Sequence, residues 1–203
     1  MKISRRFTAV LGVAAAMALP VAAQAQVSYY TTGVFSNATN GPNVYKNGGV
    51  TIKYNGTTIT TATPSNINFG SFATSGLGTG TYSGTFTLNV FQTSPTGGNG
   101  HFLGSFGGVL TATNNDGTTS SLVNWIPSST SLTIGNSTYT LFTNNTSDGP
   151  GYAIVAPDKD GNQDVKGTTT IQGYVTTPEP SSMALLGTGL VGLVPMIRRK
   201  KQK

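Results

Sequence analysis

The sequence predicts an all-β fold, an antiparallel β-sandwich or jelly-roll-like domain, on three observations. Apolar and polar residues alternate with a period of two through most of residues 26–176, and no apolar stripe with a 3.6-residue period accompanies them. Loops rich in Gly, Asn, Ser, Thr and Pro separate these segments. Many short strands at such spacing, without helical patterns between them, are typical of two packed antiparallel sheets.

The strand candidates follow one another along the chain. In VTIKYNGTTIT, alternation is interrupted by Asn55-Gly56, which predicts a type I′ hairpin with a returning arm. Gly135-Asn136 repeats this device in SLTIGNSTYTLF. The other candidates are residues 28–35, 66–72, 82–92, 101–112, 121–126, 152–156 and 168–176.

One core is expected between the sheets, because the alternation gives each strand an apolar face. Threonine covers the other faces, where it favours strands and stays hydrated without charge. The residues expected to point inward are Phe86, Leu88, Val90, Leu122, Ile134, Tyr139, Leu141, Ile171 and Val175.

The positive charges lie at the two ends of the chain. The 203 residues carry a formal net charge of +6, but residues 26–180 hold four lysines against six carboxylates and no arginine. Binding to nucleic acid needs clustered Lys and Arg to displace counterions from phosphates. The body is therefore mildly acidic, and a nucleic-acid partner is excluded.

The N-terminal residues 1–25 read as a signal peptide for the Sec translocon. Three positive charges precede an apolar run, and Ala23-Gln24-Ala25 offers small residues for cleavage after Ala25. The Arg5-Arg6 pair also suggests the twin-arginine route, but its flanking residues satisfy that motif only in part. The mature chain is expected to begin at Gln26.

The C-terminal residues 177–203 form a tripartite tail. Pro178-Glu179-Pro180 precedes an apolar span over residues 181–197, expected as a hydrophobic helix, and a basic end over residues 198–203. At 1.5 Å per residue the span covers roughly 25 Å, slightly less than a ~30 Å hydrocarbon core. The basic end would stay cytoplasmic, which leaves the body outside an inner-membrane anchor.

This tail resembles the PEP-CTERM sorting signal of exported proteins in Gram-negative-type bacteria. The resemblance implies that an exosortase recognises the tail and cuts near Pro-Glu-Pro, with anchoring in the inner membrane only transient. It also implies delivery to the cell surface or to an extracellular polysaccharide matrix. The processing residues that it implies are Pro178, Glu179, Pro180, Arg198, Arg199 and Lys200. An ordinary C-terminal membrane anchor is the alternative.

The body offers little chemistry for catalysis. There is no cysteine, and the only histidine is His101, with no G-x-S-x-G motif to accompany it. Glycoside hydrolysis needs two carboxylates across a cleft, but the aspartates lie in predicted turns. We therefore predict a non-enzymatic protein, with a glycan-active hydrolase as the least favoured alternative.

The segment DKDGNQDVKGTT contains a weak calcium motif and no other cofactor signal. Asp158, Asp160, Asn162 and Asp164 match alternate ligand positions of a calcium loop. However, Gln163 replaces the turn glycine and Thr169 replaces the bidentate glutamate. A solvated polar loop is the preferred interpretation, and a calcium-stapled loop is the alternative.

The sequence thus predicts an exported surface or matrix protein with a structural or adhesive role, which contacts extracellular polysaccharide. A carbohydrate-binding module is the second hypothesis, because Trp125 and eight tyrosines could stack on sugar rings. A core or edge position is the more frequent one for a single tryptophan. Of the adjacent Tyr29 and Tyr30, one must face out of the sheet.

Overall fold

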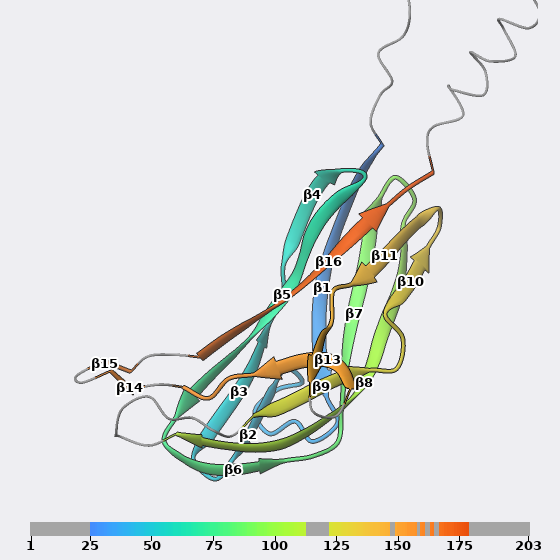
Figure 1. Ribbon diagram of the computed structural model, residues 1–203. Helices are drawn as coiled ribbons and strands as arrows, with labels where there is room; N and C mark the ends of the chain where they lie inside the picture. Colours follow the sequence, from blue (N-terminus) through green and yellow to red (C-terminus); the bar gives the residue numbers. More distant parts are fainter. Residues whose placement is uncertain are drawn as a thin grey trace, which may run out of the picture. The chain divides into compact units, whose positions relative to one another are not determined.

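A computed structural model of the chain describes residues 25–112, 122–146, 149–157, 159–160, 163–164 and 167–178. Within these residues every regular element is a strand and every strand pairing is antiparallel (Figure 1). The predicted all-β antiparallel class is confirmed. The compact unit runs from Gln26 to Pro178.

The larger sheet has eight strands. In spatial order these are β12 (Asn144–Thr146), β13 (Gly149–Ile154), β9 (Val123–Pro127), β8 (Gly98–Ala112), β7 (Thr85–Ser94), β1 (Gln26–Phe35) and β4 (Thr58–Ala62), with β6 (Gly78–Tyr82) pairing along the second half of β8. Gly108, at a φ of +140°, lies where β8 passes from β7 to β6.

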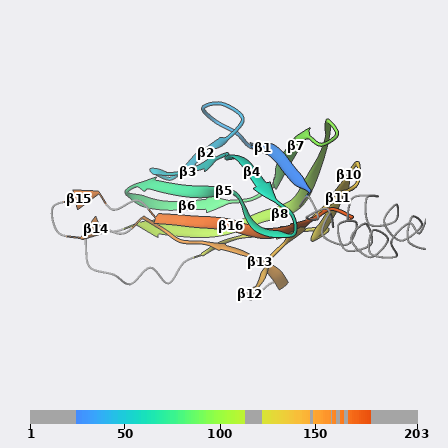
Figure 2. The same ribbon diagram turned by 90° about the horizontal axis from the view of Figure 1, so that it is seen from above.

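The second sheet has six strands. Their order is β10 (Ser131–Ile134), β11 (Ser137–Leu141), β16 (Gly167–Thr176), β5 (Ser65–Gly76), β3 (Val50–Asn55) and β2 (Val44–Asn47). A separate two-stranded pair, β14 (Lys159–Asp160) and β15 (Gln163–Asp164), stands away from both sheets at the end where β16 begins (Figures 1 and 2).

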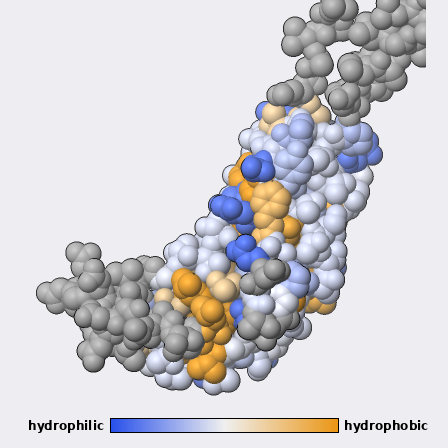
Figure 3. Space-filling view, in the orientation of Figure 1, coloured by the Kyte–Doolittle hydropathy of each residue, from blue (hydrophilic) through white to orange (hydrophobic). Residues whose placement is uncertain are grey.

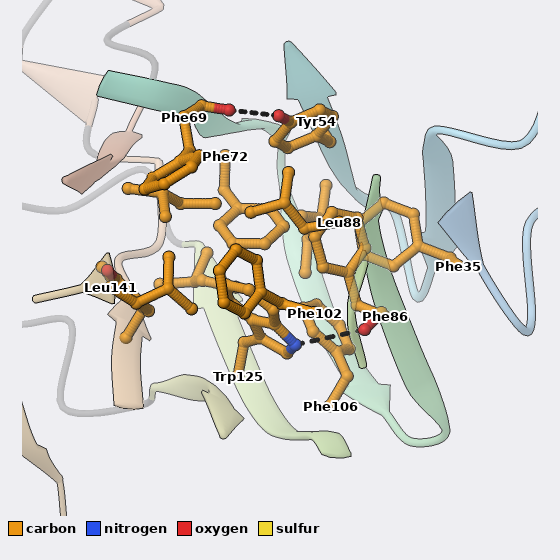
Figure 4. Packing of buried hydrophobic residues seen from close by; sticks show 14 of the residues in the cluster. Phe35, Tyr54, Phe69, Phe72, Phe86, Leu88, Phe102, Phe106, Trp125 and Leu141 are labelled. Atoms are coloured by element: carbon orange, nitrogen blue, oxygen red, sulfur yellow. Dashed lines mark hydrogen bonds between the residues drawn. The ribbon is translucent and has the colours of Figure 1, made fainter. Parts of the chain in front are cut away.

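Both sheets contribute aromatic side chains to one core (Figure 4). Trp125 is fully buried there, its indole N–H donates to the Phe86 carbonyl oxygen at 3.2 Å, and its ring meets the Phe86 ring edge-on at 5.2 Å. Such edge-to-face pairs stabilise by about 0.5–1.5 kcal/mol beyond the area they bury. Trp125 is thus a core residue and is not available to stack on a sugar.

Eight of the nine predicted core residues are buried, and Leu122 is wrong. Leu122 is 46% exposed, whereas the next residue, Val123, is fully buried at the start of β9. In a strand, a shift of one residue moves a side chain to the opposite face. The buried eight are Phe86, Leu88, Val90, Ile134, Tyr139, Leu141, Ile171 and Val175.

The predicted hairpin at Asn55-Gly56 is also wrong, since the chain crosses there from one sheet to the other. β3 pairs with β2 and β5, whereas β4 pairs with β1. Neither Asn55 nor Gly56 has the positive φ that a type I′ turn requires. Instead, the backbone of Thr57 bonds to Thr31 of β1: its N–H donates to Thr31 Oγ1 at 3.0 Å and its carbonyl accepts from Thr31 N at 2.9 Å.

The second predicted hairpin is confirmed. Ile134 lies opposite Ser137 in the β10–β11 pairing, so Gly135 and Asn136 form a two-residue turn. Gly135 has a φ of +58° and Asn136 has no positive φ, the pattern of a type II′ turn rather than I′. The strands β2, β6, β12, β14 and β15 were not among the predicted segments.

Five buried tyrosine hydroxyls bond across the two sheets. Tyr29 donates to the Asn68 carbonyl at 2.8 Å, Tyr82 to the Val50 carbonyl at 2.7 Å and Tyr152 to the Gln172 carbonyl at 2.8 Å. Tyr139 donates to Gln92 Oε1 at 2.7 Å, and Tyr54 bonds to Thr31 Oγ1 at 2.8 Å and to the Phe69 carbonyl oxygen (Figure 4). In a chain without cysteine, these bonds fix the two sheets against each other.

Candidate functional site

A hollow of about 420 Å³ lies where β4 of the larger sheet meets β5 and β16 of the second sheet. We call it the β4–β16 hollow. On this face, apolar surface is flanked by hydrophilic residues (Figure 3). Three amides (Asn66, Asn68 and Gln172), three apolar side chains (Ile59, Ile67 and Phe142), Thr61 and Gly173 line it. None of the described residues that line it is charged.

Strand geometry places the three amides side by side. Asn66 and Asn68 are two residues apart on β5, so they point to the same face. Gln172 of β16 lies directly opposite Asn68, and side chains so paired have Cβ atoms about 5 Å apart. The amides form a short row along one side of the hollow.

Two of these amides are free to bind a ligand. Asn68 Oδ1 accepts from the Gly70 backbone N–H at 2.6 Å, which fixes that side chain. The side chains of Asn66 and Gln172 make no hydrogen bond to any residue that the structure describes. Each therefore offers an amide N–H₂ donor and a carbonyl acceptor to the hollow.

Phe142 supplies the aromatic part of the lining. It follows β11, its backbone N–H donates to the Gln172 carbonyl at 2.9 Å, and its side chain is 45% exposed. Close packing requires glycine at position 173, because a Cβ there would lie 2.2 Å from the Thr140 carbonyl oxygen and 2.4 Å from the Phe69 ring. An aromatic face beside amides suits a ligand with both C–H and hydroxyl surfaces.

A second aromatic surface lies on the outer face of the larger sheet. Tyr30 and Phe91 stack with ring centroids 4.7 Å apart and an interplanar angle of 9°. Tyr30 is 40% exposed whereas Tyr29 is 1% exposed, so the prediction that one of them faces outward is confirmed. His101 lies two rungs along this face, opposite Asn89, exposed and inside β8 rather than at its start.

The predicted calcium residues are described only in part. Asp160 and Asp164 belong to the β14–β15 pair, in which Asp160 lies opposite Gln163, while Asp158 and Asn162 lie outside the described residues. In the described part of the chain, no group of three or more His, Asp or Glu side chains is placed to hold a metal. Calcium binding stays a prediction.

The sorting residues lie mostly outside the described part as well. Pro178 is exposed, whereas residues 1–24, Glu179, Pro180, Arg198, Arg199 and Lys200 are not described. β16 continues through Thr176, and Thr177 Oγ1 hydrogen-bonds Thr63 Oγ1. The ordered contacts of the body therefore extend to Thr177, the residue directly before Pro178. Among the residues described, no helix is long and apolar enough to cross a membrane.

Comparison with known proteins identifies the tail. Residues 176–201 match the family model of the PEP-CTERM protein-sorting motif, which confirms the resemblance drawn from the sequence. The chain thus carries the signal of an exported, exosortase-targeted protein. No curated protein and no solved structure matches the chain significantly.

Sequence reasoning missed the β4–β16 hollow. The alternation Asn66-Ile67-Asn68 does indicate two amides on one strand face. The partners Ile59, Phe142 and Gln172 come from three other places in the chain. The β5–β16 pairing brings Gln172 beside the amides, a backbone bond to Gln172 brings Phe142, and β4 of the other sheet supplies Ile59.

Proposed function

We propose that the folded body has a non-enzymatic, structural or adhesive role at the cell surface or in an extracellular polysaccharide matrix. The Sec translocon exports the chain, cleavage after Ala25 frees Gln26, and the tail holds the body in the inner membrane of a Gram-negative-type bacterium. An exosortase then cuts near Pro-Glu-Pro and releases the body to its destination. The matched sorting motif supports this route.

The observation that carries the proposal is that the body is poor in charge and rich in hydroxyl side chains. Between Gln26 and Asn115 the charged residues are Lys46 and Lys53 alone. Exposed hydroxyls pair across neighbouring strands, as between Ser28 Oγ and Thr60 Oγ1 at 2.8 Å. Such a surface suits many weak hydrogen bonds to neutral polysaccharide, and it gives little attraction to a polyanion.

Cosedimentation with the polysaccharide of the producing organism tests this role. The chain should sediment with the polymer equally at 0.05 M and 0.5 M salt, since screening weakens charge contacts and leaves neutral hydrogen bonds unchanged. Failure to sediment, or release by salt, would contradict the proposal. Intact masses from strains with and without the exosortase test the route: loss of the residues after about Pro180 should require the enzyme.

A defined carbohydrate-binding module is the second candidate, and the β4–β16 hollow favours it. Protein sites for small ligands are clefts of about 300–1,000 Å³ with apolar walls and a few convergent polar groups. The hollow has that size and composition. Among the residues that the structure describes, none that lines it is a carboxylate of the kind that glycoside hydrolysis uses in pairs.

A further inference from the structure

We propose that the β4–β16 hollow is a saccharide subsite that selects neutral over acidic sugars, binding one or two pyranose units of the matrix polysaccharide. This inference rests on the proposed function, because that function brings the body to the polymer. The contact with the polymer is assigned to the β4–β16 hollow, and the sugar that fits there is a neutral pyranose.

The match to a pyranose follows from the two sides of the hollow. A pyranose has C–H surfaces above and below the ring and hydroxyls around its edge. Phe142, 45% exposed, offers the C–H surface an aromatic face. Asn66 and Gln172 offer unused donors and acceptors to neighbouring hydroxyls. Each hydroxyl can both donate and accept, as an amide pair requires.

The fixed amide at Asn68 orients the site. Its Oδ1 is held by the Gly70 N–H, so its N–H₂ group keeps a constant direction beside Gln172. The row is built on β5 and β16, which pair over nine rungs from Thr74–Gly167 to Ser65–Val175. Ligand groups on paired strands keep their geometry before binding, which lowers the entropic cost of association.

The hollow is expected to select against acidic sugars because none of its described lining residues is cationic. A carboxylate entering the hollow would lose hydration, and none of the lining residues in the described part of the chain is a Lys, Arg or His that would compensate. A neutral hydroxyl at the same position exchanges water for amide bonds at little net cost. The discrimination is therefore electrostatic and needs no steric exclusion.

Titration of the full-length chain with oligosaccharides from the neutral and acidic fractions of the host's own matrix polysaccharide tests the assignment. The neutral fraction should bind, and the acidic fraction should bind at least tenfold more weakly. Phe142→Ala should weaken neutral binding about tenfold and Gln172→Ala about three- to tenfold, which correspond to about 1.4 and 0.7–1.4 kcal/mol.

Matched controls come from the opposite face. Leu103 is 42% exposed and Asn99 is exposed on the larger sheet, so Leu103→Ala and Asn99→Ala should leave the affinity unchanged. Unfolding midpoints measured for all variants confirm that each is folded. Gln172→Glu is a second probe, since a carboxylate of nearly the same shape should abolish any residual binding of the acidic fraction.

The outcomes separate this inference from the proposed function. Loss of neutral binding in the hollow variants alone supports both. Neutral binding that survives Phe142→Ala and Gln172→Ala but is lost in Tyr30→Ala overturns the hollow and keeps the matrix role. Equal binding of the two fractions overturns the selectivity. No cosedimentation of the unaltered chain with the whole polymer overturns the proposed function itself.

Discussion

Removing the Tyr139 hydroxyl tests whether tyrosine hydrogen bonds hold the two sheets together. In Tyr139→Phe the ring stays in the core, but Gln92 Oε1 loses its donor. Gln92 is buried and its Nε2 already donates to the Thr96 carbonyl at 2.8 Å, so the side chain cannot turn toward water without losing that bond. A buried acceptor left unpaired costs about 1–3 kcal/mol. We expect a loss of about 2 kcal/mol in the free energy of unfolding.

Urea unfolding followed by the fluorescence of Trp125 measures this loss, because the single tryptophan is fully buried in the same core. Tyr30→Phe is the matched control: Tyr30 is 40% exposed and its hydroxyl bonds to no described residue. The control should change stability by less than about 0.5 kcal/mol. Equal losses in the two variants would refute the reasoning.

A double-mutant cycle with Gln92→Leu isolates the bond itself. Gln92→Leu alone leaves the Tyr139 hydroxyl and the Thr96 carbonyl without this partner. When both polar groups are replaced by apolar ones, no buried group of the pair remains unsatisfied. The double variant should therefore lose about 1–2 kcal/mol less than the two single losses added together. Strict additivity would show that the contact contributes nothing.

Three further predictions concern the same core. Burial raises the pKa of Tyr82 from 10.0 to about 12 and raises the pKa of four other tyrosines. As the pH rises, the tyrosines of the unfolded chain therefore lose their protons before those of the folded chain. Stability that is complete below pH 10 should fall between pH 10 and 12, which urea midpoints would show. A flat profile there would contradict it. Gly33→Ala places a Cβ 2.5 Å from two buried rings and should lower the free energy of unfolding by at least about 2 kcal/mol. Gly107→Ala is the control and should change stability little, because the nearest contact of its Cβ is 3.6 Å away. Comparable urea midpoints for the two variants would count against this reasoning. Thr31→Val removes the hydroxyl that accepts from the Thr57 N–H and the Tyr54 hydroxyl and donates to the Phe69 carbonyl. It should cost about 2 kcal/mol in the same assay, with Thr58→Val on the exposed edge as control; identical unfolding curves would exclude a role for these bonds.

Local sequence patterns predicted the class of the fold. The predictions failed where contacts between residues distant in the sequence determine the structure. Alternation placed eight of nine core residues correctly, because the period of a strand is a property of neighbouring residues. Asn55-Gly56 has the composition of a hairpin turn, but Thr31, some 25 residues earlier, holds Thr57 in the other sheet. Local turn preference is outweighed when a buried side chain satisfies the same backbone groups.

The two candidate sites also differ in whether local sequence or long-range contacts define them. The sorting tail is a contiguous motif that needs no folded partner, so its residues could be found from the sequence alone. The β4–β16 hollow joins residues 59, 66, 142 and 172, whose proximity depends on the order of strands in two sheets. The sequence indicated its two β5 amides and gave no sign of the aromatic side chain opposite them.

The two ends of the compact unit meet, and this decides which surfaces lie beside a point of attachment. Gln26 pairs with Ala62, Ser65 pairs with Val175, and Thr63 bonds to Thr177, so the first and last strands end beside the Thr63-Pro64 turn (Figure 1). Attachment through either terminus would therefore hold the body by that one end. The β4–β16 hollow and the Tyr30–Phe91 pair both lie near that end, since Thr61 and Asn66 of the hollow flank the Thr63-Pro64 turn and Tyr30 pairs with Thr58 of the same edge strand, so an attachment there would lie beside both surfaces.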